Sequence, residues 1–68
     1  MRLSEFHRRA NDVFGETHAD WVLHSHHLSG LGYTAEAALD AGTDPRVVWE
    51  ILCDDFKVPM DRRLGHDV

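Results

Sequence analysis

Apolar residues recur along this chain at intervals of three and four positions, which is the period of an amphipathic helix. The first segment with this pattern covers residues 4–14, with Ser4 as the expected N-cap and Gly15 as the residue that ends the helix. We find no alternation of period two, so the pattern predicts no strands. One stripe of the first helix is expected to face a core, and it comprises Leu3, Phe6, Ala10, Val13 and Phe14.

Two further segments continue the helical pattern after Gly15. The longer covers residues 16–28, and the acidic residues in its first turn favour the positive end of a helix dipole. The shorter covers residues 35–41, with Thr34 as its expected N-cap and Gly42 as its stop signal. The first two thirds of the chain are thus predicted to be three short helices separated by turns.

The last predicted helix has the clearest boundaries. Asp44 is its expected N-cap, and Pro45 stands at the first helical position, which proline favours. The pattern runs through Phe56, and Pro59 prevents any continuation. The buried stripe of this helix is expected to comprise Val48, Trp49, Leu52, Cys53 and Phe56.

Helices of this length are marginal in isolation and must be held together by mutual packing. The sequence therefore predicts an all-α fold, a small compact orthogonal bundle of about four short helices. We expect residues 1–60 to form this single domain and residues 61–68 to be a flexible polar tail. A hydrophobic content of 43% favours a folded core over disorder.

The two predicted helices in the C-terminal half have the spacing of a helix–turn–helix pair. Ala38 permits close approach, Gly42 makes the turn, and Val48 with Ile51 anchors the second helix. A DNA-reading helix needs donors for phosphates and base edges. The exposed face of the second helix is instead close to neutral, so its charge disfavours DNA binding; it presents Arg46, Val47, Glu50, Asp54 and Lys57.

Charge is unevenly distributed along the chain, which has 12 acidic and 7 basic residues and a net charge of −5. Residues 10–56 contain a single base, Arg46, and such an acidic body disfavours nucleic acid as a partner. Convergence of the chain ends in the fold would create a basic patch and favour nucleic acid again. That patch would comprise Arg2, Arg8, Arg9, Arg62 and Arg63.

Four of the six histidines lie within residues 18–27, and this density raises the question of a metal site. On a helix, Asp20, His24 and His27 fall in one sector, where two imidazoles and a carboxylate are a partial zinc ligand set. No second histidine pair or Cys-x-x-Cys motif supplies further ligands. We therefore interpret Asp20 and His24 as a pair one turn apart on a solvated face, and we expect no cofactor.

The sequence also indicates a protein without enzymatic activity. Its single cysteine, Cys53, precedes Asp54 and Asp55, whose charge disfavours a reactive thiolate, so we expect a small buried residue there. No nucleophile elbow, phosphate-binding loop or aligned pair of acids is present. The chain has one cysteine, no apolar run of about 18 residues and no apolar signal region. These features predict a cytoplasmic protein that is not inserted in a membrane.

Two stretches have a recognisable pattern, namely MRLSEFHRR at the start and ALDAGTDPRVVWEILCDDFKVP in the C-terminal half. They resemble a family of small uncharacterised actinobacterial proteins, domain-of-unknown-function family 3046. The resemblance implies a small helical fold without catalytic residues and, from the genes that neighbour family members, a link to recombination or repair. The turn GYT at residues 32–34 is shorter than the turn expected for the family.

These observations favour a non-enzymatic adaptor or regulator that binds another protein. The expected partner-binding residues are Arg46, Val47 and Glu50, together with Trp21, since tryptophan is enriched where binding energy concentrates. The alternative is a helix–turn–helix protein that binds DNA through Arg46 and the terminal arginines. A weaker alternative is the zinc site at Asp20, His24 and His27. The oligomeric state is left open.

Overall fold

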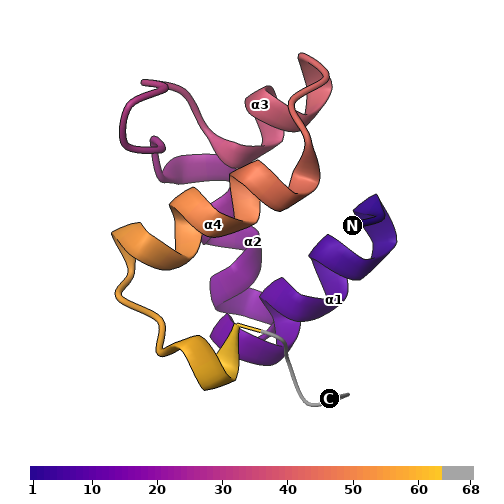
Figure 1. The fold of residues 1–68 in the computed structure, drawn as a ribbon, viewed down its shortest axis with the longest axis vertical. Helices are drawn as coiled ribbons and strands as arrows, with labels where there is room; N and C mark the ends of the chain where they lie inside the picture. The colour runs from indigo at the N-terminus through magenta and orange to yellow at the C-terminus, as the bar shows by residue number, and fades with distance from the viewer. Residues whose placement is uncertain (64–68) are drawn as a thin grey trace.

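The computed structural model describes residues 1–63, which form an all-α bundle and contain no strand (Figure 1). In Figure 1, α4 crosses in front of α2 at a steep angle, with α1 and α3 on either side of the crossing. The predicted small orthogonal bundle is confirmed. Its elements are α1 (Leu3–Phe14), α2 (Glu16–Ser25), α3 (Ala35–Asp40), α4 (Pro45–Asp55) and a 3-10 helix, η1 (Met60–Arg62).

The start of α1 differs from the prediction, whereas its end agrees with it. Arg2 is the N-cap, and its carbonyl accepts the first helical hydrogen bond, from the N–H of Phe6 at 3.0 Å. Ser4 therefore lies inside the first turn, and its prediction as the N-cap is wrong. Gly15 ends α1 with φ +83°, and its N–H donates to the carbonyl of Asn11 at 2.9 Å.

Helix α2 ends at Ser25, three residues earlier than predicted. Beyond it the chain turns back, and His27 pairs with Thr34 in an isolated antiparallel bridge. The N–H of Leu28 donates to the carbonyl of Tyr33 at 2.9 Å, so this loop satisfies its own backbone. Leu28 is buried as expected, but it reaches the core from the loop and not from a helix.

Side-chain caps start both helices of the C-terminal half, as predicted. Thr34 Oγ1 accepts from the N–H of Ala37 at 3.2 Å, and Asp44 Oδ1 accepts from the N–H of Arg46 at 2.9 Å. Gly42, with φ +93°, makes the turn between α3 and α4. Helix α3 ends one residue earlier than predicted.

The core forms where the inner faces of all four helices meet. Leu3, which the pattern assigned to the buried stripe of α1, is 49% exposed, and Val13, Phe14 and Phe56 are only partly buried. These four residues lie at helix ends, where fewer neighbouring elements cover them. The buried residues are Phe6, Ala10, Ala19, Val22, Leu23, Leu28, Ala35, Ala38, Val48, Trp49, Leu52, Cys53 and Val58.

The chain folds back against α4 after Pro59. Trp49 Nε1 donates to the carbonyl of Arg63 at 2.8 Å, and Arg63 Nε donates to the carbonyl of Val58 at 2.9 Å. The predicted tail, residues 61–68, thus begins within η1 and its cap. Residues 64–68 lie outside the described part of the chain.

The C-terminus of α4 adopts a Schellman motif with an unusual residue. The N–H of Val58 donates to the carbonyl of Cys53 at 2.9 Å, and the N–H of Lys57 donates to the carbonyl of Asp54 at 3.2 Å. Lys57 has φ +54°, the left-handed region, where glycine is the usual choice because it has no Cβ. The motif therefore holds a lysine at an energetic cost.

Replacing Lys57 with glycine is expected to raise the free energy of unfolding by about 1 kcal/mol, because the left-handed conformation costs residues with a Cβ roughly that much. In a domain of this size the melting temperature should rise by roughly 4–8 °C. Thermal unfolding followed by circular dichroism measures the change. Lys57→Ala retains the Cβ and is the matched control, and an equal rise in that variant would contradict the explanation.

Candidate functional site

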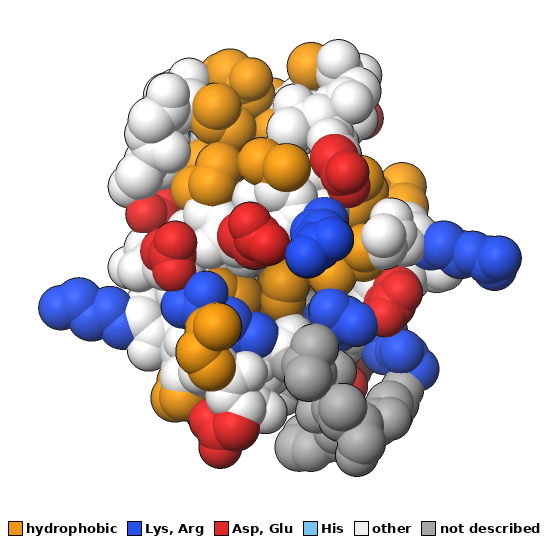
Figure 2. All heavy atoms as spheres, in the orientation of Figure 1, with side chains coloured by type: hydrophobic (Ala, Val, Ile, Leu, Met, Phe, Trp, Pro, Cys, Tyr) orange, Lys and Arg blue, Asp and Glu red, His pale blue; other side chains and the backbone are white. Residues whose placement is uncertain are grey.

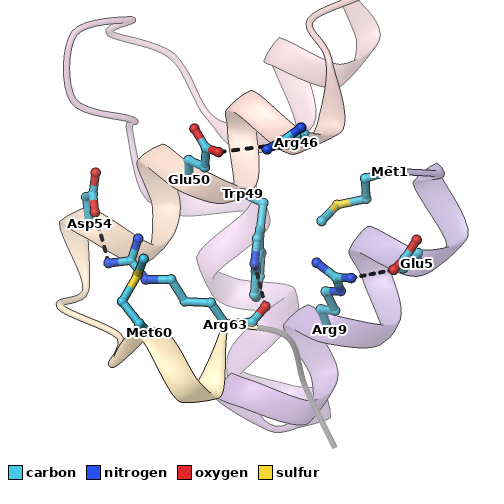
Figure 3. A pocket seen from close by; sticks show the side chains of 9 residues that line it. All are labelled: Met1, Glu5, Arg9, Arg46, Trp49, Glu50, Asp54, Met60 and Arg63. Carbon is cyan, nitrogen blue, oxygen red and sulfur yellow. Dashed lines mark hydrogen bonds and ion pairs between the residues drawn. The ribbon is translucent and has the colours of Figure 1, made fainter. Parts of the chain in front are cut away.

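A groove of about 600 Å³ opens between α1, α4 and η1, and we call it the α1–α4 groove (Figure 3). It brings residues from the two ends of the described chain to the same place. Figure 3 shows the indole of Trp49 in the middle, with Arg9 on one side and Met60 on the other. The lining residues are Met1, Glu5, Arg9, Arg46, Trp49, Glu50, Asp54, Met60 and Arg63.

Helical geometry explains why these side chains share a groove. Residues four positions apart on a helix lie on the same face. Helix α1 contributes Glu5 and Arg9 in this spacing. Helix α4 contributes Arg46, Glu50 and Asp54, each one turn after the last. The groove is thus bordered by two helical faces whose charged residues repeat at every turn.

The floor and ends of the groove are apolar. Trp49 is 3% exposed, its ring meets that of Phe6 edge-on at 5.7 Å, and its N–H is satisfied by the carbonyl of Arg63. Met1 and Met60 stand at the rim, and Met60 is 76% exposed. Unbranched methionine side chains adapt readily to a partner's shape, so this rim suits binding better than rigid packing.

Each arginine of the groove faces a carboxylate, so the groove is electrically balanced. The pairs are Arg9 with Glu5, Arg46 with Glu50 at 3.6 Å, and Arg63 with Asp54 at 2.9 Å. The two members of the last pair are not equally accessible. The side chain of Arg63 is 21% exposed and that of Asp54 is 71% exposed, whereas Arg46 and Glu50 are both well exposed, at 73% and 61%.

The terminal arginines converge only in part. Arg9 and Arg63 both reach the α1–α4 groove, where each is paired with a carboxylate. Arg62 lies elsewhere, with Nη2 donating to the carbonyl of Val13 at 3.4 Å. Figure 2 shows basic and acidic side chains interspersed over the α4 face. In the part of the chain that the structure describes, the arginine side chains of the groove are thus all paired, which disfavours a nucleic acid there.

The structure divides the predicted partner-binding residues between two surfaces. Arg46 and Glu50 line the α1–α4 groove, and Val47, between them in the sequence, is 44% exposed on α4. Trp21 lies on α2, outside the groove lining. It is 54% exposed, and its ring stacks on that of His18 with centroids 5.8 Å apart.

The histidine cluster is separated by the fold. His24 Nε2 lies 3.2 Å from Asp20 Oδ1, the predicted pair one turn apart, while His24 Nδ1 faces the carboxylate of Glu36 on α3. His27 lies in the loop after α2, in its bridge with Thr34. Within residues 1–63, no group of three or more His, Cys, Asp or Glu side chains is arranged to hold a metal ion.

Among the polar connections that sequence reasoning missed is the link between the loop after α2 and the end of α4. Asp55 Oδ2 lies 2.8 Å from His26 Nε2 and accepts from the N–H of Ser29 at 3.0 Å. Burial raises the pKa of Asp55, but the hydrogen bonds from Ser29 and His26 outweigh this and hold it below its ordinary value. Partners 26 to 29 residues away leave no local sequence signal.

Cys53 is fully buried, as predicted, and burial is the main cause that raises the pKa of its thiol to about 11. At pH 8 only roughly one thiol in a thousand would be ionised. We therefore expect iodoacetamide to label the native protein far more slowly than the urea-unfolded protein, as measured by mass spectrometry. Equal labelling rates in the two states would contradict this.

None of the helices within residues 1–63 has the length and apolar character needed to cross a membrane. The helical bundle and its charge-balanced groove define the class of protein, a small all-α domain. The family described as "Protein of unknown function (DUF3046)" matches residues 1–61. The chain belongs to this family, and the resemblance noted from its sequence is confirmed.

A longer mycobacterial protein is also similar to this chain. It is named "Putative envelope-preserving system protein Rv2742c", from Mycobacterium tuberculosis (strain ATCC 25618 / H37Rv). The two are 46% identical over 46 residues, which represent 63% of this chain and 17% of that protein. The chain thus spans less than a fifth of its relative's length. No solved structure matches this chain.

Proposed function

We propose that this protein is a non-enzymatic adaptor whose α1–α4 groove binds an amphipathic helix of another protein. The observation that carries the proposal is the groove itself, with an apolar floor at Trp49 and methionines at its rim. A helix laid in a groove is a common mode of peptide recognition, in which residues one turn apart act as anchors. The bordering helical faces repeat their charges at the same interval.

Charge indicates which kind of helix fits. Along the α4 border Asp54 is far more exposed than its partner Arg63, Glu50 is itself well exposed, and the whole chain has a net charge of −5. A partner helix with basic residues along one edge would meet these carboxylates and be attracted from a distance.

The DNA-binding alternative has weaker support. A DNA-binding protein of this kind would insert the first turns of α4 into the major groove of DNA. These turns present Arg46, Val47 and Glu50, and Asp44 is their N-cap. Arg46 is already paired with Glu50. This surface has no net positive charge to neutralise phosphates, so a protein partner agrees better with the geometry.

The mycobacterial relative suggests a setting for such an adaptor. Its name refers to an envelope-preserving system, and the similar segment is a small part of a long chain. We propose that the present protein serves an assembly of that kind, on the cytoplasmic side. Its single cysteine, buried and unpaired, is compatible with a reducing compartment.

An NMR titration with isotope-labelled protein tests the groove. The probe is a 14-residue peptide with leucines on one helical face and lysines along its edges, and its counterpart has glutamates in place of the lysines. We expect the lysine peptide to shift the indole N–H signal of Trp49 and the methyl signal of Met60. Binding should weaken at least tenfold in the double variant Glu50→Lys/Asp54→Lys, because both exposed carboxylates are reversed.

A second double variant, Glu16→Lys/Asp40→Lys, changes the net charge by the same amount outside the groove lining. Its affinity for the lysine peptide should stay within threefold of the original. Equal weakening in both double variants would mean non-specific attraction to an acidic protein and would contradict the proposed groove. A stronger interaction with the glutamate peptide at the groove would do the same.

A further inference from the structure

A second hollow, of about 330 Å³, lies where the end of α1 meets the start of α2 and the end of α4. It is separate from the α1–α4 groove and shares no lining residue with it. We call it the Lys57 face and define it by six side chains. These are Phe14, His18, Phe56, Lys57 and Arg62, with Trp21 stacked on His18 at its edge.

Aromatic rings form the base of the Lys57 face. Phe14 and Phe56 meet edge-on at 5.3 Å, and His18 contacts both, at 6.0 and 6.5 Å between centroids. The stack of Trp21 on His18 extends this aromatic surface towards solvent. Partly exposed rings that brace one another offer contact area at little entropic cost, which is why aromatic residues anchor protein interfaces.

The Lys57 face is positively charged, whereas the chain as a whole is negatively charged. Lys57 and Arg62 line the hollow, and among residues 1–63 no aspartate or glutamate does. The acids nearest to Lys57 in the sequence are engaged elsewhere, Asp54 with Arg63 and Asp55 with His26. In a chain with a net charge of −5, this leaves two cations over an aromatic base.

The backbone supplies an independent observation. Lys57 has φ +54° at a helix end where glycine would be relaxed. Residues held in such conformations concentrate where their side chain has a role, and the inference runs from the observed strain to the function. Because Lys57 is exposed and lines the hollow, packing does not account for its presence.

From these observations we propose that the Lys57 face binds a short acidic segment of a partner protein that contains an apolar or aromatic residue. The carboxylates of the segment pair with Lys57 and Arg62, and its apolar side chain packs on Phe14 and Phe56. Two cations are too few to retain a nucleic acid against the acidic body, so protein is the favoured partner. This second site makes the domain a bridge, and it stands independently of the α1–α4 groove.

An NMR titration with the full chain tests the Lys57 face. The probe is a hexapeptide with two glutamates on each side of a central Leu-Phe, compared with its lysine counterpart and with an eight-nucleotide oligothymidine. We expect the glutamate peptide to shift the amide signals of Phe14, His18 and Lys57 and the indole N–H of Trp21. Its affinity should fall at least fivefold in Lys57→Gly and in Arg62→Gln, and stay within twofold in Lys57→Arg.

Lys57→Gly also separates binding from folding, because its melting temperature should rise while its affinity falls. The groove variant Glu50→Lys/Asp54→Lys should bind the glutamate peptide at least as tightly as the original protein does. Unchanged affinity in Lys57→Gly would overturn the proposal. Tighter binding of the lysine peptide or of oligothymidine at this face would also overturn it, the latter in favour of a nucleic acid.

Discussion

Phe6→Ala is expected to remove a large share of the free energy of unfolding. Phe6 is fully buried, and its ring packs edge-on against Trp49 at 5.7 Å. Truncating such a core phenylalanine costs about 3–5 kcal/mol through lost burial and the cavity left behind. At about 0.05–0.15 kcal/mol per residue, a chain of this length has only roughly 3–10 kcal/mol to lose. Urea unfolding followed by circular dichroism measures the free energy of unfolding.

Leu3→Ala is the matched control, because the hydrophobic pattern assigns both residues to the same stripe of α1. Leu3 is 49% exposed, so its truncation should change the free energy of unfolding by less than about 0.5 kcal/mol. A comparable loss in the two variants would mean that both side chains contribute to the core. It would then contradict the packing of α1 described above.

The second large effect is expected at Asp55, whose carboxylate joins the loop after α2 to α4. Asp55→Asn keeps the shape of the side chain but removes the charge that attracts His26 and the N–H of Ser29. The side chain of Asp55 is only 9% exposed, so water replaces these partners poorly. We expect a loss of about 1.5–3 kcal/mol at pH 7, the range for hydrogen bonds to a charged group, measured by urea unfolding.

The same variant should show a defined pH dependence. Because the pKa of Asp55 is lowered by folding, its contribution to stability is present above the unfolded value, near 3.9, and is lost as the pH falls through the folded value. The difference in stability between the original protein and Asp55→Asn should therefore narrow between pH 5 and pH 3. Asp61→Asn, at an exposed carboxylate of η1, should show little difference at either pH. If the stability difference between the original protein and Asp55→Asn stayed constant over this pH range, it would falsify the stabilising role of the Asp55 carboxylate.

Local signals predicted the elements well where capping residues and breakers mark them. Asp44, Thr34 and Gly42 act at the positions that their chemistry predicts, because caps and turns depend on residues two or three positions apart. Ser4 failed as an N-cap, since the helix begins before it. The predicted end of α2 was also wrong, because the bridge between His27 and Thr34, which forms only when the loop closes, takes His27 out of the helix.

The candidate site was predictable only in part. Arg46 and Glu50 were identified from the exposed face of α4, and they line the groove. Arg9 and Arg63 join them from opposite ends of the described chain. Both arginines are paired with carboxylates. Because a paired arginine attracts phosphate weakly, their convergence does not favour nucleic acid as the sequence analysis expected of a basic patch.

By itself the sequence determined the all-α class, most of the periodic core faces, the N-caps of α3 and α4, the buried state of Cys53 and the family, because each depends on residue type and short spacing. The tertiary structure decided which faces meet: the groove over Trp49, the aromatic base beneath Lys57 and the link from His26 to Asp55. These contacts join residues far apart along the chain. Their geometry follows from how four helices cross, which periodicity alone does not specify.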